Sequence, residues 1–493
     1  MLKKFTDTAL FYRLTEAMVP FLTWVIITLP IWLSPFHPAI VAYFILAYFL
    51  YFFYKTVKTV YFAGIAYQLM QQAAKIPWYK KLQKINNWKN IRHFIVITNY
   101  KESTEKVAKT IRKIQEQDYD LKKIHVVLAM EEREESEASE RSNKLTKDFG
   151  DKFGGFYTTY HRLEEGEVVG KASNESFAAS FIDKLVNDQG WETKEILLTI
   201  CDADSLLPSD YLSYLTLEFL KDKDKQYHFY WAPVLPYNNF WLLPLPIRVQ
   251  SILSSIVRLS LLPQRDDLIQ ISTYSTSLWL LKSVGFWDVD IIPEDWHIWL
   301  QAFFKHGKKV KTLPIYLPIS ADAVLTKNLF STFRNRYEQE RRWAWGATDI
   351  PYAIKKSLET PDVPFFAKLK KIFFLIEIHL LWPTAFFILT LSAWIPGVVN
   401  RRFAGTVMGF ILPRLSSVIL TATSVLLLFM LYFDHKVREQ IKVKTRLRHV
   451  PILFIQWYLL PIISFLFSSL PALEAHTRIL LGKKLEYKVT EKV

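Results

Sequence analysis

Hydrophobic and polar positions divide the chain into apolar ends and a mixed middle. The 38 residues from Ala17 to Tyr54 contain no Lys, Arg, Asp or Glu, whereas one membrane span needs about 17–25 apolar residues. The stretch therefore predicts two short spans joined at Ser34-Pro35-Phe36-His37-Pro38. A cleavable signal peptide carries one shorter apolar run that ends in small residues, and this pattern does not fit it.

The C-terminal third repeats the apolar pattern. Three segments lack acidic and basic residues and are long enough to cross a membrane: 378–400, 415–433 and 450–473. Pro461 and Pro471 fall inside the third segment, and a proline interrupts the hydrogen bonding of a helix. Two arrangements stay open, namely three crossings or a last segment that enters the membrane and returns, and we favour the return.

Basic residues beside these segments predict their orientation. Residues 75–92 hold six Lys or Arg and no acid, and residues 434–448 hold six against two acids. Positive charge marks the cytoplasmic side of a membrane. We therefore expect an integral protein of the plasma or inner membrane whose middle region is cytosolic.

The middle of the chain, residues 88–349, alternates β-rich runs with helical segments. This alternation predicts a mostly parallel sheet, with a ligand site at the carboxyl ends of its strands. The predicted strands are 94–98, 124–130 and 196–200, the predicted helices include 103–117 and 172–187, and residues 131–140 are interpreted as a short acidic loop. The predicted units are a transmembrane hairpin over 1–75, an α/β domain over 76–350, and an interfacial and transmembrane region with a cytosolic tail over 351–493.

Composition narrows the partners. The chain has 62 Lys and Arg against 47 Asp and Glu, a formal net charge of +15, which suits nucleic acid, anionic lipid headgroups or nucleotide phosphates. The excess flanks apolar segments, and the sheet lacks interleaved basic and aromatic residues, so we expect membrane lipids and no nucleic acid. The single cysteine, Cys201, excludes an internal disulfide and a CxxC metal site.

Two acidic pairs are candidates for chemistry. Asp202 and Asp204 follow the third predicted strand, where carboxylates suit Mg²⁺ or Mn²⁺ and, through the metal, a diphosphate. A lone D-x-D more often marks a solvated turn, but its place after an apolar strand favours a site. Glu294 and Asp295 begin a predicted amphipathic helix, either as ordinary first-turn acids or as a general base with a pKa raised by burial. His297 is interpreted as a packed helical histidine rather than a metal ligand.

The most specific string is Gln339-Glu340-Arg341-Arg342-Trp343. An amide, a guanidinium and an indole on adjoining turns can hold a diphosphate and stack on a sugar ring. The alternative is a basic interfacial helix with its Trp at the headgroup level. Residues 242–262 are apolar, and an interfacial helix that docks the domain on the membrane and a buried core helix explain them about equally well.

In their order, Asp202-x-Asp204, Glu294-Asp295 and Gln339-x-x-Arg342-Trp343 resemble the motifs of the membrane-embedded family-2 glycosyltransferases, which include cellulose, chitin and hyaluronan synthases. Three further strings are similar to family motifs: Asn99-Tyr100-Lys101-Glu102 to T-Y-N-E, Lys171-Ala172-Ser173-Asn174 to K-A-G-N, and Tyr487-Lys488-Val489-Thr490-Glu491-Lys492 to the gating segment F-x-V-T-x-K. The resemblance covers about Phe94 to Gly346. The chain departs from the family at Glu131-Glu132 (for D-D-G), at Ser272–Thr276 (for F-x-C-G-S) and at Pro293 (for the T of T-E-D).

The resemblance implies an α/β domain of the GT-A fold, with a Rossmann-like mixed sheet, flanked by transmembrane helices. It implies inverting transfer from a nucleotide sugar, in particular a UDP-sugar, to a polysaccharide or lipid-linked acceptor. The implied roles are Asp295 as base with Glu294 beside it, Asp204 for Mg²⁺ or Mn²⁺, Trp343 at the acceptor, and Tyr100, Glu102, Glu131, Lys171, Asp202, Gln339 and Arg342 at the donor. An export partner or a homo-oligomer fits such an enzyme. The alternative class is a membrane scaffold or export component with an inactive sugar-nucleotide domain, against which the complete set of acids argues.

Overall fold

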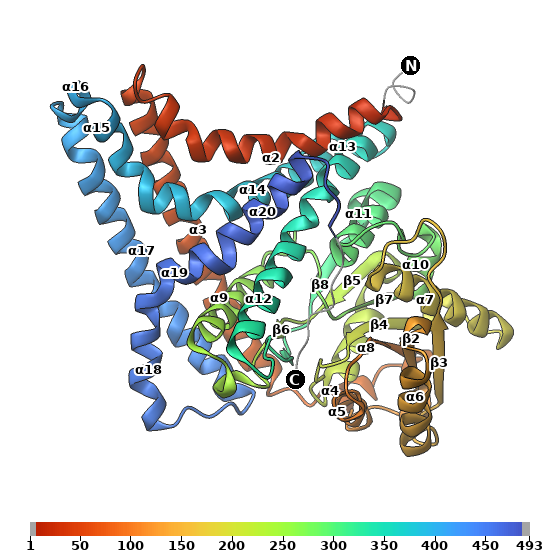
Figure 1. The fold of residues 1–493 in the computed structure, drawn as a ribbon. Helices are drawn as coiled ribbons and strands as arrows, with labels where there is room; N and C mark the ends of the chain where they lie inside the picture. Colours follow the sequence, from red (N-terminus) through yellow and green to blue (C-terminus); the bar gives the residue numbers. More distant parts are fainter. Residues whose placement is uncertain (1–5, 486–493) are drawn as a thin grey trace.

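The computed structural model describes residues 6–485, and the string Tyr487–Lys492 lies outside the described residues. A seven-stranded sheet forms the centre of the middle region, in the order β3-β2-β1-β4-β7-β5-β8 (Figure 1). Its strands are β1 (Arg92–Thr98), β2 (Ile124–Glu131), β3 (Gly155–His161), β4 (Ile196–Asp202), β5 (His228–Trp231), β7 (Tyr274–Ser277) and β8 (Lys311–Pro314). The first four strands are parallel, β7 runs antiparallel to β4 and β5, and β8 is parallel to β5. A second sheet pairs β6 (Val234–Leu235) with β9 (Ile319–Ser320).

The predicted sheet is confirmed in type, and the three predicted strands are β1, β2 and β4. The pattern did not predict β3, β5, β7 and β8, of which β7 is antiparallel to its neighbours. Strand β3 lies at the sheet edge and is mostly half-buried, so it lacks the continuous apolar run that marked its neighbours. Asp202 therefore ends the fourth strand and not the third. The interpretation of residues 131–140 as a loop is wrong: Glu131 ends β2, and helix α6 (Ser136–Phe149) begins five residues later. The buried apolar residues of this helix include Ala138 and Leu145. Such a small apolar face does not give a recognisable helical pattern among so many charged residues.

Helices cover both faces of the sheet (Figure 1). Their bounds are α4 (Trp78–Leu82), α5 (Thr104–Gln115), α7 (Lys171–Asp188), α8 (Tyr211–Lys221), α9 (Leu245–Leu261), α10 (Leu278–Val284), α11 (Glu294–His306), α12 (Leu329–Ala344) and α13 (Asp349–Glu359). The interior of the sheet is dry, since Phe94, Ile95, Val96 and Ile97 of β1 are fully buried. Burying each such side chain contributes roughly 1.5–3 kcal/mol, which makes β1 and its neighbours a firm base for the loops at their carboxyl ends.

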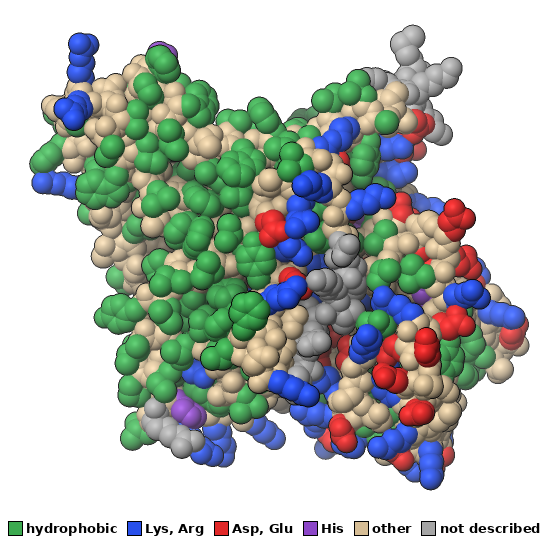
Figure 2. All heavy atoms as spheres, viewed as in Figure 1, with side chains coloured by type: hydrophobic (Ala, Val, Ile, Leu, Met, Phe, Trp, Pro, Cys, Tyr) green, Lys and Arg blue, Asp and Glu red, His purple; other side chains and the backbone are tan. Residues whose placement is uncertain are grey.

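Long apolar helices form the rest of the molecule. Their bounds are α2 (Ala9–Trp32), α3 (Pro38–Ala73), α14 (Phe365–Leu391), α15 (Ile395–Val399), α16 (Arg401–Ala404), α17 (Val407–Gln440), α18 (Val450–Ile455), α19 (Leu460–Ser464), the π-helical turn η12 (Phe465–Ser469) and α20 (Leu470–Leu480). Within residues 6–485, five segments are long and apolar enough to cross a membrane: Ala9–Trp32, Pro38–Ala73, Phe365–Val399, Val407–Gln440 and Val450–Leu480. Hydrophobic side chains cover this part, and charged ones gather over the sheet domain (Figure 2).

Helix α9, from the apolar stretch at 242–262, lies between the two parts of the molecule. It packs on α3, α17 and α19 on one side and on β6 on the other, and Ile247, Ile252 and Ile256 are buried. It is therefore a buried helix that joins the sheet domain to the apolar helices, as the interpretation of residues 242–262 as a buried helix predicted.

Both ends of the last apolar segment contact the sheet domain or the start of α2. At its beginning, the His449 ring stacks on Trp241, with ring centroids 3.9 Å apart. At its end, Glu474 accepts hydrogen bonds from Tyr337 and Arg341 of α12, at 2.8 and 2.7 Å. Arg13 of α2 donates to the carbonyl of Ile479 at 2.7 Å. The segment thus starts and finishes near the elements that carry the cavity described next.

Candidate active site

One cavity of about 2280 Å³ opens at the carboxyl ends of the parallel strands. These ends meet at one edge, since Thr98 of β1 is in register with Asp202 of β4 and with Ala129 of β2. All of the residues proposed from the motifs line this cavity: Tyr100, Glu102, Glu131, Lys171, Asp202, Asp204, Glu294, Asp295, Gln339, Arg342 and Trp343. The cavity continues between the membrane helices, where Phe386, Leu427 and Ile463 line it.

Lys171 is the centre of an ion cluster in this cavity. Its Nζ lies 2.7 Å from Asp202 Oδ1, 3.3 Å from Glu294 Oε1 and 3.3 Å from Glu175 Oε1. Burial by itself lowers the pKa of Lys171, but the three carboxylates outweigh it and raise that pKa well above its ordinary value. One ammonium group is therefore shared by three acids that come from α7, β4 and α11.

Glu175 is a site residue that the motifs did not reveal. It is fully buried, and neither carboxylate oxygen has a hydrogen-bond partner among residues 6–485, so the ion pair with Lys171 is its main compensation. Burial raises the pKa of Glu175 well above its usual range. The available signal was its position four residues after Lys171 on a helix, which places both on one face.

Ser272 connects the two acidic pairs. Its hydroxyl donates to Asp202 and its backbone amide donates to Asp295 Oδ2 at 2.9 Å. Ser272 has a φ of 67°, in the left-handed region that a non-glycine residue adopts at an energetic cost. The loop before β7, where the chain departs from the F-x-C-G-S pattern, therefore aligns Asp202 and Asp295 toward the same space.

Asp295 has the environment of a base that works near neutral pH. It lies in the first turn of α11, where the amide of Trp296 donates to Oδ1 at 2.8 Å. Burial and then the neighbouring Glu294 carboxylate raise the pKa of Asp295 to about 7, although the amides of Ser272 and Trp296 oppose the rise. A general base is most effective when its pKa lies near the working pH.

Asp204 lies in the cavity, where its carboxylate contacts the loop around Asp322. Its Oδ2 accepts from the amide of Asp322 at 3.3 Å, and Asp322 pairs with Lys106 at 3.2 Å. Within residues 6–485, no group of three or more His, Cys, Asp or Glu is arranged to hold a metal ion. Mg²⁺ is commonly bound by one or two carboxylates together with substrate phosphates, so the oxygen donors at Asp204 fit a cation that arrives with a diphosphate.

Tyr100, Glu102 and Glu131 lie together at the ends of β1 and β2. The Arg133 guanidinium lies 3.9 Å from the centre of the Tyr100 ring and pairs with Glu131. Glu102 accepts from the amide of Tyr100. Burial raises the pKa of Glu131, while Arg133 lowers it. Arg133, which the motifs did not reveal, thus places a cation beside an aromatic face and a buried carboxylate.

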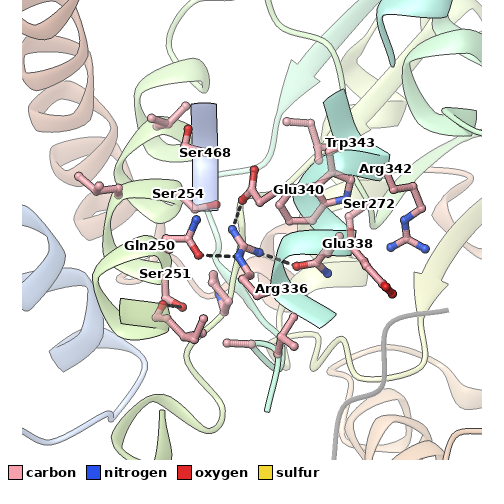
Figure 3. Close-up of a pocket in the computed structure, with 18 of the residues that line it drawn as sticks. Gln250, Ser251, Ser254, Ser272, Arg336, Glu338, Glu340, Arg342, Trp343 and Ser468 are labelled. Atoms are coloured by element: carbon pink, nitrogen blue, oxygen red, sulfur yellow. Dashed lines mark hydrogen bonds and ion pairs between the residues drawn. The ribbon is translucent and has the colours of Figure 1, made fainter. Parts of the chain in front are cut away.

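Helix α12 presents the Gln339-x-x-Arg342-Trp343 string to the cavity. Residues three and four apart share a face of a helix, and Arg342 and Trp343 both lie at the cavity with Ser272 nearby (Figure 3). Trp343 is 37% exposed, so its ring is available for stacking. The opposite side of α12 contacts α20 through Tyr337 and Arg341.

His297 holds the start of α11 in place. Its Nδ1 lies 2.7 Å from Asp349 Oδ1 at the start of α13, and its Nε2 lies 2.9 Å from Asp288 Oδ2. The ring is buried, as expected for a packed histidine. Burial lowers the pKa of His297, but Asp349 and Asp288 outweigh it and raise that pKa to about 9. At neutral pH the His297 imidazolium, in the same turn of α11 that carries Glu294 and Asp295, therefore connects the Asp349 and Asp288 carboxylates.

The pairing of His297 with Asp349 and Asp288 predicts that the protein loses stability at alkaline pH. The pKa of His297 is higher in the folded chain than its ordinary 6.5, so its contribution is complete below about pH 6.5 and disappears as pH rises through 9. We expect a fall in the free energy of unfolding on the order of 3 kcal/mol across this range. Thermal unfolding in detergent between pH 6 and 9.5 measures it. His297→Gln should remove this pH dependence and His306→Gln, at the other end of α11, should retain it; an unchanged slope in His297→Gln contradicts the prediction.

Comparison with known proteins adds a family. Residues 197–467, more than half of the chain, match Glycosyl transferase family group 2. Similar solved structures include the mannosyltransferase PcManGT from Pyrobaculum calidifontis in complex with GDP-Man and Mn²⁺, at 14% identity, TM-score 0.44, 81% of this chain and 99% of that one. Another is S. aureus TarS 1–349 in complex with UDP-GlcNAc, at 10% identity, TM-score 0.38, 72% of this chain and 93% of that one. No curated protein matches the chain. The strand order and the family match confirm the predicted fold class, a GT-A domain with apolar helices at both ends.

Proposed function

The chain belongs to Glycosyl transferase family group 2, and on that premise we propose that it is a membrane enzyme that moves a sugar from a nucleotide sugar, in particular a UDP-sugar, to a glycan or lipid-linked acceptor. One observation carries the proposal. A carboxylate whose pKa is raised to about 7, Asp295, shares a cavity with Asp202, Asp204 and Lys171. A base, a cation-binding carboxylate and a lysine shared by several acids in one cavity suit transfer with loss of a diphosphate.

The proposed reaction is a direct displacement with inversion. The acceptor hydroxyl forms a bond to the anomeric carbon while its proton passes to Asp295. The bond from that carbon to the diphosphate oxygen breaks on the opposite face, and the electron pair leaves with the nucleoside diphosphate. Glu294, held by Lys171 at 3.3 Å, orients the acceptor hydroxyl. A Mg²⁺ or Mn²⁺ ion at Asp204, when bound, supplies positive charge that neutralises the diphosphate.

The remaining motif residues divide between the donor and the acceptor. Tyr100, Glu102 and Glu131 hold the nucleoside, and Asp202 orients the donor sugar. Lys171, Arg342 and Gln339 lie around the space for the diphosphate; an arginine binds phosphate through two parallel hydrogen bonds. Trp343 bounds the acceptor site by stacking on a sugar ring. Support comes from their common lining of one cavity.

The membrane helices supply the acceptor side in this proposal. The cavity continues past Phe386, Leu427 and Ile463 of three membrane helices, so an acceptor reaches Asp295 from the bilayer, as a growing glycan or on a lipid carrier. We place the sheet domain in the cytosol and the last apolar segment in a return path, which the contacts at both of its ends support. A second copy or an export partner would receive a polymeric product.

Nucleotide release by the purified protein in detergent tests the function. With a panel of nucleotide sugars and Mn²⁺ or Mg²⁺, we expect one donor to release its nucleoside diphosphate, and EDTA to abolish the release. Asp204→Asn should raise the metal concentration needed by at least about tenfold, because the variant lacks a charged oxygen ligand. Asp151→Asn, at an exposed position, is the control. The product distinguishes the acceptors, since a glycan gives a ladder of lengths and a lipid carrier gives one discrete glycolipid. If the protein neither releases nor binds any nucleotide, the proposal is contradicted and the scaffold is favoured.

A further inference from the structure

Arg336, three residues before Gln339 on α12, is a buried arginine that lies outside every recognised motif. Its Nε donates to Gln250 Oε1 at 2.8 Å, and its Nη1 donates to Gln339 Oε1 at 2.5 Å. Its Nη2 pairs with Glu340. Figure 3 shows the guanidinium between Gln250 and Glu340, at the wall of the cavity. All three nitrogen atoms of this group are therefore used by neighbouring side chains.

The bond to Gln339 orients its amide. Because Oε1 accepts from a charged donor, the amide nitrogen Nε2 is the end of the side chain that remains to donate. Gln339 lines the cavity. An amide held in this way presents an N–H donor and not an acceptor, and a leaving diphosphate needs donors.

Gln250 extends the network to the last apolar segment. It lies on α9, and its Nε2 donates to the carbonyl of Phe467, inside the π-helical turn η12. A π-helical turn changes the regular hydrogen bonding of a helix and is frequent at functional sites. The position of this membrane segment therefore sets the position of Gln250 and, through it, of the Arg336 guanidinium.

Arg336 is not free to bind a phosphate itself. Glu340 is buried beside it, and Arg336 and Arg258 oppose the rise that burial causes in the Glu340 pKa. The Arg336 guanidinium carbon lies 5.0 Å from the centre of the Trp343 ring, so the same group also contacts the residue proposed at the acceptor. Since Glu340 balances its charge and neighbouring side chains accept from its nitrogen atoms, Arg336 orients those side chains instead of binding a phosphate.

We propose that Arg336 is a positioning residue, which turns the Gln339 amide nitrogen toward the leaving diphosphate. The Phe467 carbonyl positions Gln250, and Gln250 positions the Arg336 guanidinium. This inference rests on the proposed function. Hydrogen bonds to a charged group contribute about 1.5–3 kcal/mol, so loss of the Gln339 donor should lower kcat roughly 10–100-fold. The donor KM should change little, because the diphosphate carries its full charge only as it leaves.

A double-mutant cycle tests the inference. Arg336→Lys keeps the positive charge but loses the planar guanidinium that donates to several neighbours at once, and we expect about a tenfold lower kcat for sugar transfer. If Arg336 acts through Gln339, then Arg336→Lys combined with Gln339→Ala should be no slower than Gln339→Ala alone, within about twofold. Affinity for the intact nucleotide sugar, measured by calorimetry, should stay within about twofold for Arg336→Lys. Arg112→Lys, at an exposed position of α5, is the control for the same exchange and should keep the wild-type kcat.

A second variant covers the case in which Arg336→Lys does not fold. Gln250→Met removes the acceptor of Nε at similar volume and should lower kcat about threefold, again only when Gln339 is present. Independent effects in the Gln339→Ala background, or wild-type rates in both variants, would overturn the inference. Absence of transfer by the wild-type protein with every donor would instead contradict the proposed function, on which the inference depends.

Discussion

Replacing Asp295 by Asn is expected to lower kcat by about 10²–10⁴-fold, the usual contribution of a positioned general base. Asparagine keeps the shape of the side chain, but its single carbonyl oxygen can accept from only one of the two amides, that of Ser272 or that of Trp296. It cannot take a proton from the acceptor hydroxyl. Nucleotide binding should stay within about twofold, because the proposed donor contacts lie on other residues.

The pH profile separates a base from a binding residue. Since the pKa of Asp295 is raised to about 7, kcat/KM of the wild-type enzyme should rise tenfold per pH unit below about 7 and level off above it. Asp295→Asn should lack this limb. Measuring initial rates of nucleotide release from pH 5 to 9 gives both results. Asp290→Asn, an exposed position in the loop before α11, is the control, and a wild-type profile that is flat through pH 7 would contradict the assignment.

Replacing Lys171 by Met is expected to impair both activity and stability. The change leaves Asp202, Glu175 and Glu294 close together without their shared cation. Removing one partner of a buried ion pair typically costs about 3–5 kcal/mol, so the melting temperature should fall by several degrees. Activity should fall by about 10²–10³-fold, since Asp202 and Glu294 lose their alignment and the diphosphate loses a cation.

Glu175 distinguishes the two effects of that substitution. Adding Glu175→Gln removes the buried carboxylate that depends most on Lys171, so the double variant should recover much of the lost melting temperature without recovering activity. Thermal unfolding and nucleotide release on the same preparations give the comparison. Lys184→Met, at an exposed position of the same helix, should behave as wild type. If the double variant is as unstable as Lys171→Met, the stability loss does not come from uncompensated charge at Glu175.

The apolar ends and the motif order could be predicted from the sequence because each depends on local chemistry. A run without charges, such as 17–54, is a membrane candidate whatever surrounds it. The strands around Phe94 and Ile196 show as apolar runs because they are buried on both faces. An edge strand such as β3 has no such run, and the helix after Glu131 is hidden by its charged surface. Local patterns therefore predicted the long parallel strands β1, β2 and β4 and missed both the edge strand β3 and the short strands β5, β7 and β8.

What the sequence by itself determined is the family resemblance, the apolar segments and the motif residues, since residue type and spacing carry that information. Only the tertiary structure revealed which groups meet them. Ser272 joins Asp202 to Asp295, and Arg336 reaches Gln339 and Gln250, through contacts between residues as many as 86 positions apart. The raised pKa of Asp295 follows from burial and from the nearby Glu294 carboxylate. Charge balance and desolvation depend on distances in space, which the order of residues along a chain does not contain.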